Sequence, residues 1–342
     1  MQKSIKIFIT IIIIGISITI IGLLLYFNPD WPDNNDNDDR MFKRAHHRTY
    51  EGFEKDYNLE WKKDFFFIQA ADPQYGLMEK LENPNLIIST NWTNERELLT
   101  KAIKQWNEMN PKPRFVVICG DLVNDPPFQN QTKRREQLND LKKDLHQLDQ
   151  SIPLILLPGN HDLMDKPTLE SLKQYTDEFG DDYYSFWIDS IMFIVLNTQY
   201  YKNHDQMINE FNEQNKWIDE QLMDAKSNNY THVIIFQHIP WFLKKIDEPD
   251  MDYNTIASKI RQPLMEKFID ANIHYIFAGH MHQNFEGEFF INDNRWLKMI
   301  TTSAIGAQYH AIDTEPPSKS GYRIVNVTRT NIQQKYVQIE KE

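Results

Sequence analysis

The stretch Leu156-Leu157-Pro158-Gly159-Asn160-His161-Asp162 ends a short apolar run with an amide, an imidazole and a carboxylate. An apolar run followed at once by Pro and Gly predicts a buried strand and the loop after it. An earlier segment, Phe115-Val116-Val117-Ile118-Cys119-Gly120-Asp121, has the same form. Open α/β sheets keep their sites on loops beyond the carboxyl ends of their strands, so both loops are candidates for a functional site.

Polar side chains of the same kinds follow three further apolar runs. They are Asp72 and Gln74 after the first run, His238 after the second, and His280 and His282 after the third. Divalent transition metals bind carboxylate, amide and imidazole groups. One such residue alone is more often a turn or cap residue. Five strand ends of this kind together predict a site for two metal ions that share one aspartate.

The chain beyond Trp61 alternates short apolar runs with longer amphipathic stretches, which predicts strands interleaved with helices. Strands are predicted at residues 65–70, 115–119, 154–157, 185–188, 192–196, 233–237, 275–278, 289–291, 296–301, 322–327 and 334–339. Helices are predicted at residues 94–109, 133–148, 168–179, 205–226 and 255–269. We therefore predict a single α/β domain over residues 61–342.

Composition and charge exclude some classes of function. The formal net charge of −12 argues against nucleic acid as a partner, because phosphate backbones select basic surfaces. The single cysteine, Cys119, excludes an internal disulfide framework and a thiolate metal cluster. Its place in an apolar run indicates a buried strand residue rather than a nucleophile. A hydrophobic fraction of 41% is enough for a sizeable core.

Residues 7–27 form a segment of 21 residues without a charge, ten of them isoleucine. A helix of that length rises about 30 Å, which is enough to cross the hydrocarbon core of a bilayer. The run is longer than the hydrophobic region of a cleavable signal peptide, which has about 7–15 residues. We therefore predict an uncleaved transmembrane signal anchor over residues 1–28, followed by an acidic and polar linker over residues 29–60.

The charges on the two sides of this segment predict its orientation. Lys3 and Lys6 precede it, while five aspartates follow it between Asp30 and Asp39. Basic residues favour the cytoplasmic side, so we expect a single-pass membrane protein with a cytoplasmic N-terminus and a lumenal or extracellular domain. Four acceptor sequons for N-glycosylation agree with this orientation. They lie at Asn91, Asn130, Asn229 and Asn326.

The polar motifs together resemble the ordered signature of the calcineurin-like metallophosphoesterases. That signature consists of Asp-x-His, Gly-Asp, Gly-Asn-His-Asp/Glu, a lone His and Gly-His-x-His. The chain has Asp72-Pro73-Gln74, Gly120-Asp121, Gly159-Asn160-His161-Asp162, His238 and Gly279-His280-Met281-His282. The chain looks most similar to the calcineurin-like phosphoesterase domain-containing proteins described as serine/threonine phosphatases. The segments that carry this finer resemblance are Ala71-Asp72-Pro73-Gln74, Gln237-His238-Ile239-Pro240 and Ser303-Ala304-Ile305-Gly306.

The resemblance implies a fold and a metal centre. The fold is a four-layer α/β/β/α sandwich of two mixed sheets. The centre holds two divalent or trivalent metal ions, of Mn, Fe or Zn, with a bridging hydroxide that attacks phosphorus. By similarity, the first ion binds Asp72, Gln74, Asp121 and His282, and the second binds Asp121, Asn160, His238 and His280.

Three more residues receive roles from the same resemblance. His161 is expected to contact the substrate phosphate, and to stabilise developing charge or protonate the leaving oxygen. Asp162 either orients His161 or caps the helix that follows. Asn124 either contacts phosphate or closes the turn after the Gly-Asp motif.

Gln74 departs from the wider family, which has His at this position. An amide oxygen is a weaker and neutral donor, so the affinity and the metal identity of the first site are open. The serine/threonine phosphatase subgroup has the same Gln.

These features predict a dinuclear metal-dependent phosphatase that hydrolyses phosphate monoesters, and by resemblance a serine/threonine protein phosphatase. Its substrates would be phosphorylated proteins or small phosphate esters. Because a lumenal domain meets few phosphoproteins, a nucleotidase or cyclic-nucleotide phosphodiesterase is an alternative. A second alternative is a non-catalytic binding or scaffold protein with a decayed metal site, for which Gln74 is the only support in the sequence.

Overall fold

The computed structural model describes residues 42–339 except residues 57, 84, 87–88 and 309–317. Residues 43–342 cluster as one compact unit. The predicted membrane segment, residues 7–27, lies outside the described residues. Among the residues that are described, no helix has both the length and the apolar character that a membrane span requires.

The larger of two β-sheets has eight strands in the order β1-β2-β6-β7-β8-β9-β11-β10. The strands are β1 (Ala45–His46), β2 (Thr49–Tyr50), β6 (Tyr184–Ile188), β7 (Ile191–Val195), β8 (His232–Phe236), β9 (Ile273–Ala278), β10 (Phe285–Asn292) and β11 (Arg295–Thr301). β7, β8, β9 and β11 run parallel, while β6 pairs with β7, and β10 with β11, in antiparallel fashion. The sheet is therefore mixed, with parallel strands at its centre.

The smaller sheet has five strands in the order β13-β12-β3-β4-β5. They are β3 (Phe65–Ala70), β4 (Val116–Cys119), β5 (Leu154–Leu157), β12 (Gly321–Val327) and β13 (Ile332–Gln338). β3, β4 and β5 run parallel, and β12 is antiparallel to both β3 and β13. This sheet is also mixed, so the predicted pair of mixed sheets is confirmed.

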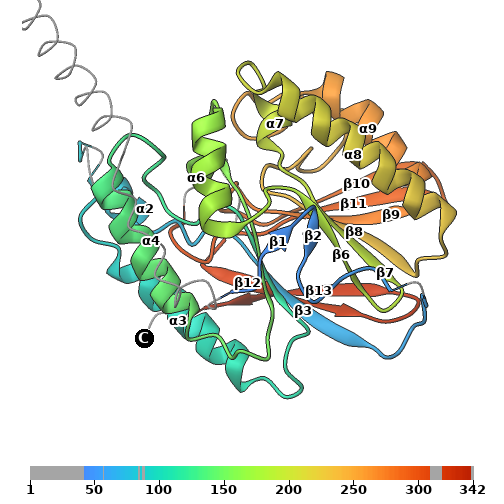
Figure 1. The fold of residues 1–342 in the computed structure, drawn as a ribbon, viewed down its shortest axis with the longest axis horizontal. Helices are drawn as coiled ribbons and strands as arrows, with labels where there is room; N and C mark the ends of the chain where they lie inside the picture. Colours follow the sequence, from blue (N-terminus) through green and yellow to red (C-terminus); the bar gives the residue numbers. More distant parts are fainter. Residues whose placement is uncertain (1–41, 57, 84, 87–88, 309–317, 340–342) are drawn as a thin grey trace, which may run out of the picture. The chain divides into compact units, whose positions relative to one another are not determined.

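Helices cover the outer faces of the two sheets (Figure 1). The helices of the described residues are α2 (Leu77–Glu82), α3 (Thr93–Glu108), α4 (Gln131–Leu145), α5 (Asn160–Leu163), α6 (Leu169–Phe179), α7 (Gln199–Lys202), α8 (Ile208–Ser227) and α9 (Ser258–Asp270). α3 packs on the five-stranded sheet, where the Trp106 ring meets Tyr322 of β12 at 5.4 Å. α8 and α9 pack on the eight-stranded sheet through a core that includes Ile218 and Phe268.

The inner faces of the two sheets share one apolar core. Phenylalanines from both sheets meet there edge to face: Phe67 lies 5.5 Å from Phe236 of β8, and Phe115 lies 5.3 Å from Phe193 of β7, between ring centroids. Alternate residues of β7 and β8 face the helices instead, because side chains along a strand alternate between its two faces. Burial on both faces explains why these strands read as continuous apolar runs.

All eleven predicted strands and all five predicted helices are present, with boundaries that differ by a few residues. The structure also has β1, β2 and three short helices that were not predicted. The linker prediction for residues 29–60 is wrong in its second half, because β1 and β2 belong to the eight-stranded sheet. Arg48 holds this segment: its guanidinium lies 2.9 Å from Asp182 and 3.5 Å from the Tyr183 ring centroid.

Candidate metal centre

The seven predicted metal ligands all lie directly beyond strands. Parallel strands in both sheets end at the same edge, so the loops after β3, β4 and β5 meet the loops after β8 and β9. Five of these ligands have positive φ angles between 39° and 72°, a region that non-glycine residues rarely adopt. They are Asp72, Gln74, Asp121, His280 and His282. Such backbone strain is common at functional sites. Here the backbone turns sharply at each of these ligands and directs its side chain inward.

Two motif glycines are needed because ligand side chains lie against their backbone. A Cβ on Gly120 would lie 2.6 Å from Nδ1 of His238, and Gly120 has a φ of +79° that favours glycine. A Cβ on Gly279 would lie 2.6 Å from Oδ2 of Asp72. The glycine before each ligand therefore makes room for a ligand from the opposite sheet.

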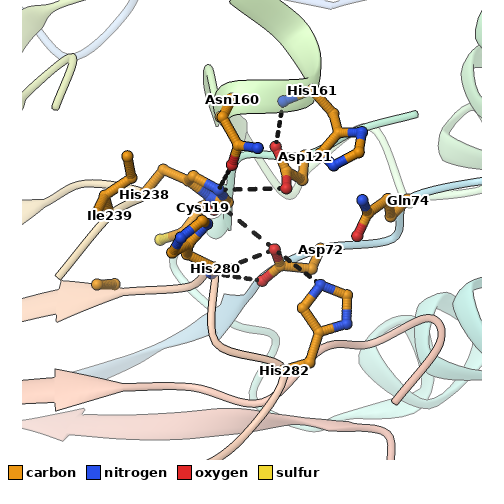
Figure 2. A network of polar contacts seen from close by, with 12 residues as sticks. Asp72, Gln74, Cys119, Asp121, Asn160, His161, His238, Ile239, His280 and His282 are labelled. Carbon is orange, nitrogen blue, oxygen red and sulfur yellow. Dashed lines mark hydrogen bonds and ion pairs between the residues drawn. The ribbon is translucent and has the colours of Figure 1, made fainter. Parts of the chain in front are cut away.

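Asp121, His238 and His280 form the tightest part of the cluster, and all three are buried. One possible ligand atom from each lies within 4.8 Å of the others. Nε2 of His238 lies 3.3 Å from Oδ2 of Asp121 and 3.1 Å from Oδ1 of Asn160. Figure 2 shows these side chains directed toward one another. Their spacing suits one metal ion with N and O ligands.

Asp72, Gln74 and His282 form the other part of the cluster. Nε2 of His282 lies 3.5 Å from Oδ1 of Asp72, and the backbone N–H of His280 donates to the same carboxylate at 3.0 Å. Gln74 is buried, and its Nε2 donates to Oδ1 of Asn124 at 3.5 Å. Its Oε1 has no hydrogen-bond partner among the described residues. A buried acceptor without a donor is costly, and a bound cation would satisfy it.

Backbone carbonyls determine which nitrogen of each histidine is available. Nδ1 of His238 lies 2.8 Å from the Cys119 carbonyl, and Nδ1 of His282 lies 2.6 Å from the Ala307 carbonyl. Nε2 of His280 lies 3.0 Å from the Tyr253 carbonyl. A carbonyl only accepts, so each of these nitrogens carries a proton, and the other ring nitrogen is the one that is able to bind a metal ion. Metal-binding histidines are commonly oriented in this way.

Asn160 is oriented by the same principle. Its Nδ2 donates to Oδ1 of Asp165 at 3.0 Å and to the phenol oxygen of Tyr253 at 2.9 Å. Both amide hydrogens are therefore used on one side, and Oδ1 faces His238. Like Gln74, Asn160 offers the cluster an amide oxygen rather than an N–H.

The electrostatics of the cluster favour a cation. Burial lowers the pKa of His238, but the carboxylate of Asp121 outweighs it and raises that pKa to about 9. Burial opposes ionisation of Asp121, yet His238 and His161 hold its pKa well below the ordinary value. Burial and the neighbouring His238 lower the pKa of His280 to about 3. The carboxylates of Asp72 and Asp121 thus attract positive charge into a buried site, where a metal ion competes with protons.

His161 lies beside the cluster rather than in it. Its backbone N–H donates to Oδ1 of Asp121 at 2.8 Å, and its ring Nδ1 lies 2.6 Å from the Asn124 carbonyl. Nδ1 therefore carries a proton, and Nε2 is the atom that is free for chemistry. Figure 2 shows the His161 ring on the same side of Asp121 as Gln74.

Asp162 does not orient the His161 ring. Its carboxylate accepts from the backbone N–H groups of Gly159 at 2.9 Å and of Leu122 at 3.2 Å, while the His161 ring is held by the Asn124 carbonyl. This arrangement corresponds to the alternative role of Asp162 as a cap of α5. Burial, followed by the nearby Asp121, raises the pKa of Asp162 to about 6.

Asn124 closes the turn after β4 and supports its neighbours. Its backbone N–H donates to the Tyr75 carbonyl at 3.1 Å, and its side-chain oxygen accepts from Gln74. With an exposure of only 2%, the side chain has little surface for a phosphate. Cys119, as predicted, is a buried strand residue, and burial raises its thiol pKa to about 12.

A comparison with protein families matches residues 67–284 to the calcineurin-like phosphoesterases. The chain belongs to this family. The matched range contains all seven predicted ligands. Serine/threonine-protein phosphatase CPPED1 from Pongo abelii is 39% identical over 302 residues, which cover 88% of this chain and 92% of the relative. The protein of the same name from Danio rerio is 37% identical over 305 residues, which cover 89% and 94%.

A solved structure of a dimetal phosphatase from Danio rerio has the same fold. It superimposes with a TM-score of 0.51 at 16% sequence identity, over 80% of this chain and 99% of that chain. At this identity the likeness concerns the fold alone.

Sequence reasoning missed one residue of this calcineurin-like phosphoesterase centre. Tyr253 contacts Asn160 through its phenol and His280 through its carbonyl. It lies in a polar loop between β8 and α9, where no strand end or spacing pattern marks it. Only the three-dimensional structure brings it to the site.

Proposed function

We propose that the chain is a dinuclear metal-dependent phosphatase that hydrolyses phosphate monoesters, and that its substrates are serine/threonine phosphoproteins. The observation that carries this proposal is the set of side-chain atoms left available to a metal ion. In each of these side chains, neighbouring groups bind the opposite polar atom. The names of the CPPED1 relatives support the phosphoprotein substrate class.

We assign the ligands as two sets that share Asp121. The first set is Asp72, Gln74, Asp121 and His282, and the second is Asp121, Asn160, His238 and His280. The chemistry of these donors fits Mn, Fe or Zn. Metal ions held there polarise phosphoryl oxygens and lower the pKa of water toward neutrality. The unpartnered Oε1 of Gln74 supports a retained first site and argues against a decayed one.

His161 is the candidate acid–base residue. Because the Asn124 carbonyl holds a proton on Nδ1, Nε2 is the ring atom left to exchange a proton with the leaving oxygen of the substrate. A hydrogen bond from Nε2 would also stabilise negative charge that develops on the phosphate. Asp162 acts only indirectly, because it fixes the backbone of the loop that carries His161.

A pair of chromogenic substrates tests the reaction class. We expect the full chain in detergent, supplied with Mn²⁺, to hydrolyse p-nitrophenyl phosphate much faster than bis(p-nitrophenyl) phosphate. The reverse preference would favour the phosphodiesterase alternative. Activity on neither substrate, together with metal analysis that finds no bound ion, would favour the scaffold alternative and refute the proposal.

We further infer that residues 7–27 anchor the chain in a membrane, with the catalytic domain on the lumenal or extracellular side. The support is the uncharged length of this segment and the basic residues before it. Protease added to sealed microsomes should leave the domain intact until detergent is added. Digestion without detergent would reverse the orientation, and release of the protein by alkaline carbonate would exclude the anchor.

A further inference from the structure

A cavity of about 240 Å³ opens beside the second set of ligands. Asn160 and His280 of the metal centre form part of its wall, together with Ile239 and Tyr253. A single water molecule needs about 10–15 Å³ of such space, so the cavity admits a ligand group of many heavy atoms. A group that enters it lies next to a phosphate at the metal centre.

The rest of the wall is polar and carries charges of both signs. It consists of Asp165, Lys166, Gln199, Lys202, Asn203 and Asp252. Two lysines and two aspartates give the ionisable residues of the wall a formal net charge of zero. One of the carboxylates, Asp165, is already bound to Nδ2 of Asn160. The wall therefore offers both hydrogen-bond donors and acceptors without a strong field of either sign.

Two side chains of the wall have unused hydrogen-bonding capacity. Nζ of Lys202 donates to the Thr255 carbonyl at 2.7 Å, and an ammonium group has three donors. Gln199 is 1% exposed, and its Nε2 donates to the Met164 carbonyl at 2.9 Å. Its Oε1 has no partner within the described part of the chain. A ligand with both acceptors and donors would use these groups, and a buried acceptor gains most from a new donor.

Tyr253 contacts two residues of the metal centre from the wall of the cavity. Its ring packs on the His280 ring at 4.9 Å, its phenol contacts Asn160, and 51% of the residue stays exposed. A half-exposed aromatic ring in the wall of a polar cavity provides apolar contact for a bound segment.

Arg261 holds the loop that carries Tyr253. This arginine is fully buried on α9 and donates to the carbonyls of Ile246 and Ile256 and to Oδ1 of Asp250, at 2.9–3.1 Å. It also donates to the Glu248 carbonyl. Because four points of one loop converge on a single guanidinium, the wall of the cavity is preorganised before any ligand arrives.

We propose that this cavity binds the polypeptide segment next to the phosphorylated residue of a substrate, with Lys202 and Gln199 as its specificity-determining residues. The proposal rests on the proposed phosphatase function and names the subsite that selects phosphopeptides over smaller esters. A polypeptide backbone carries one N–H donor and one carbonyl acceptor per residue, which matches the mixed wall.

The balanced charges of the wall do not favour a nucleoside polyphosphate as the occupant. Additional phosphates would meet the carboxylates of Asp165 and Asp252 as well as the ammonium groups of Lys166 and Lys202, so the wall offers them no net attraction. A neutral backbone needs no such attraction. The cavity therefore favours phosphoproteins among the substrates that the metal centre is able to hydrolyse.

A ratio of two substrates measures the contribution of the cavity. One substrate is a short peptide with a central phosphoserine flanked by alanines, and the other is p-nitrophenyl phosphate, which lacks any flanking segment. We expect Lys202→Met and Asn203→Trp, which remove a donor and fill the cavity, to lower the peptide-to-small-ester ratio of kcat/KM about tenfold. Lys216→Met and Asn212→Trp, on exposed positions of α8, are the matched controls.

The result separates this inference from the proposed function. If the wild-type chain hydrolyses p-nitrophenyl phosphate but the ratio is the same in all variants, the cavity does not bind the peptide, while the phosphatase function stands. A variant that loses both activities in equal proportion also overturns the inference, because the ratio is unchanged.

Binding provides a readout that needs no turnover. Fluorescence anisotropy of a labelled copy of the same phosphopeptide should give a Kd about tenfold weaker for Asn203→Trp than for the wild type and for Asn212→Trp. An equal Kd in all three proteins would refute the inference even if no substrate were hydrolysed. Tighter binding of ATP than of the phosphopeptide would refute it as well.

Discussion

The two sheets contribute different chemistry to the metal centre. The loops after β3, β4 and β5 of the five-stranded sheet supply the oxygen donors, and the loops after β8 and β9 of the eight-stranded sheet supply the three imidazoles. The oxygen donors are Asp72, Gln74, Asp121 and Asn160. The imidazoles are His238, His280 and His282. Neither sheet alone holds a donor set with both the carboxylate charge and the imidazole nitrogens that such a centre needs.

The contacts across this boundary make the two sets depend on each other. The Cys119 carbonyl on the oxygen side fixes the proton of His238, and the backbone N–H of His280 on the imidazole side binds Asp72. The centre therefore forms only when the sheets dock in the correct register. This division of the ligands between the two sheets also predicts which substitutions affect both metal sites and which affect only one.

The largest effect is expected from a change of Asp121, the residue that we assign as a ligand of both ions. Asp121→Asn removes the charge that holds His238 and His280 together, so we expect kcat/KM on p-nitrophenyl phosphate to fall about a thousandfold, equivalent to about 4 kcal/mol. Metal content should fall with it. The control is Asp205→Asn, at an exposed position outside the centre. Retention of both ions by Asp121→Asn would contradict the shared role.

Gly279→Ala tests the close contact between the two sheets without changing a ligand. The new Cβ would lie 2.6 Å from Oδ2 of Asp72, so the carboxylate must move away from its site. We expect about a hundredfold loss of kcat/KM with weaker metal binding, similar to the loss of an outer partner of a ligand. Thermal melting of the variant separates this displacement from unfolding. If Gly279→Ala keeps wild-type activity and metal content, the contact between the two sheets tolerates an added methyl group.

Gln74→His adds an imidazole to the side of the centre that otherwise supplies only oxygen donors. Imidazole is a stronger donor than an amide oxygen for Zn and Fe, so we expect about tenfold tighter binding at the first site. Competition with a fluorescent chelator measures the affinity of each site. Unchanged affinity at both sites would mean that Gln74 does not bind metal.

Tyr253→Phe is expected to have the smallest effect. It removes one neutral hydrogen bond to Asn160, worth about 0.5–1.5 kcal/mol, and keeps the carbonyl that binds His280. We expect a decrease of a few-fold in affinity at the second metal site only. A loss of binding at both sites would show that the Tyr253 loop supports the whole centre.

The sequence predicts most of the centre because its physical causes are local. An apolar run that ends in a polar loop marks each strand end, and parallel strands bring these ends to one edge of a sheet. The five loops that carry Asp72, Asp121, Asn160, His238 and His280 were found in this way, together with the strands before them.

The parts that were missed depend on distant partners. β1 and β2 have two residues each, and the polar segment that holds them shows no apolar run. They form because Arg48 meets Asp182, which lies more than a hundred positions later in the chain. The same is true of the Asn124 carbonyl, which holds His161 in place of Asp162. No local pattern reports such contacts.

The glycines that precede the ligands have a consequence for inherited variation. At Gly120, Gly159 and Gly279, the position of a Cβ is occupied by atoms of a neighbouring ligand residue. Every missense change of a glycine codon adds a Cβ, so no substitution at these three codons is conservative. In a population, such alleles are expected to behave as losses of function although every metal-binding side chain is still encoded.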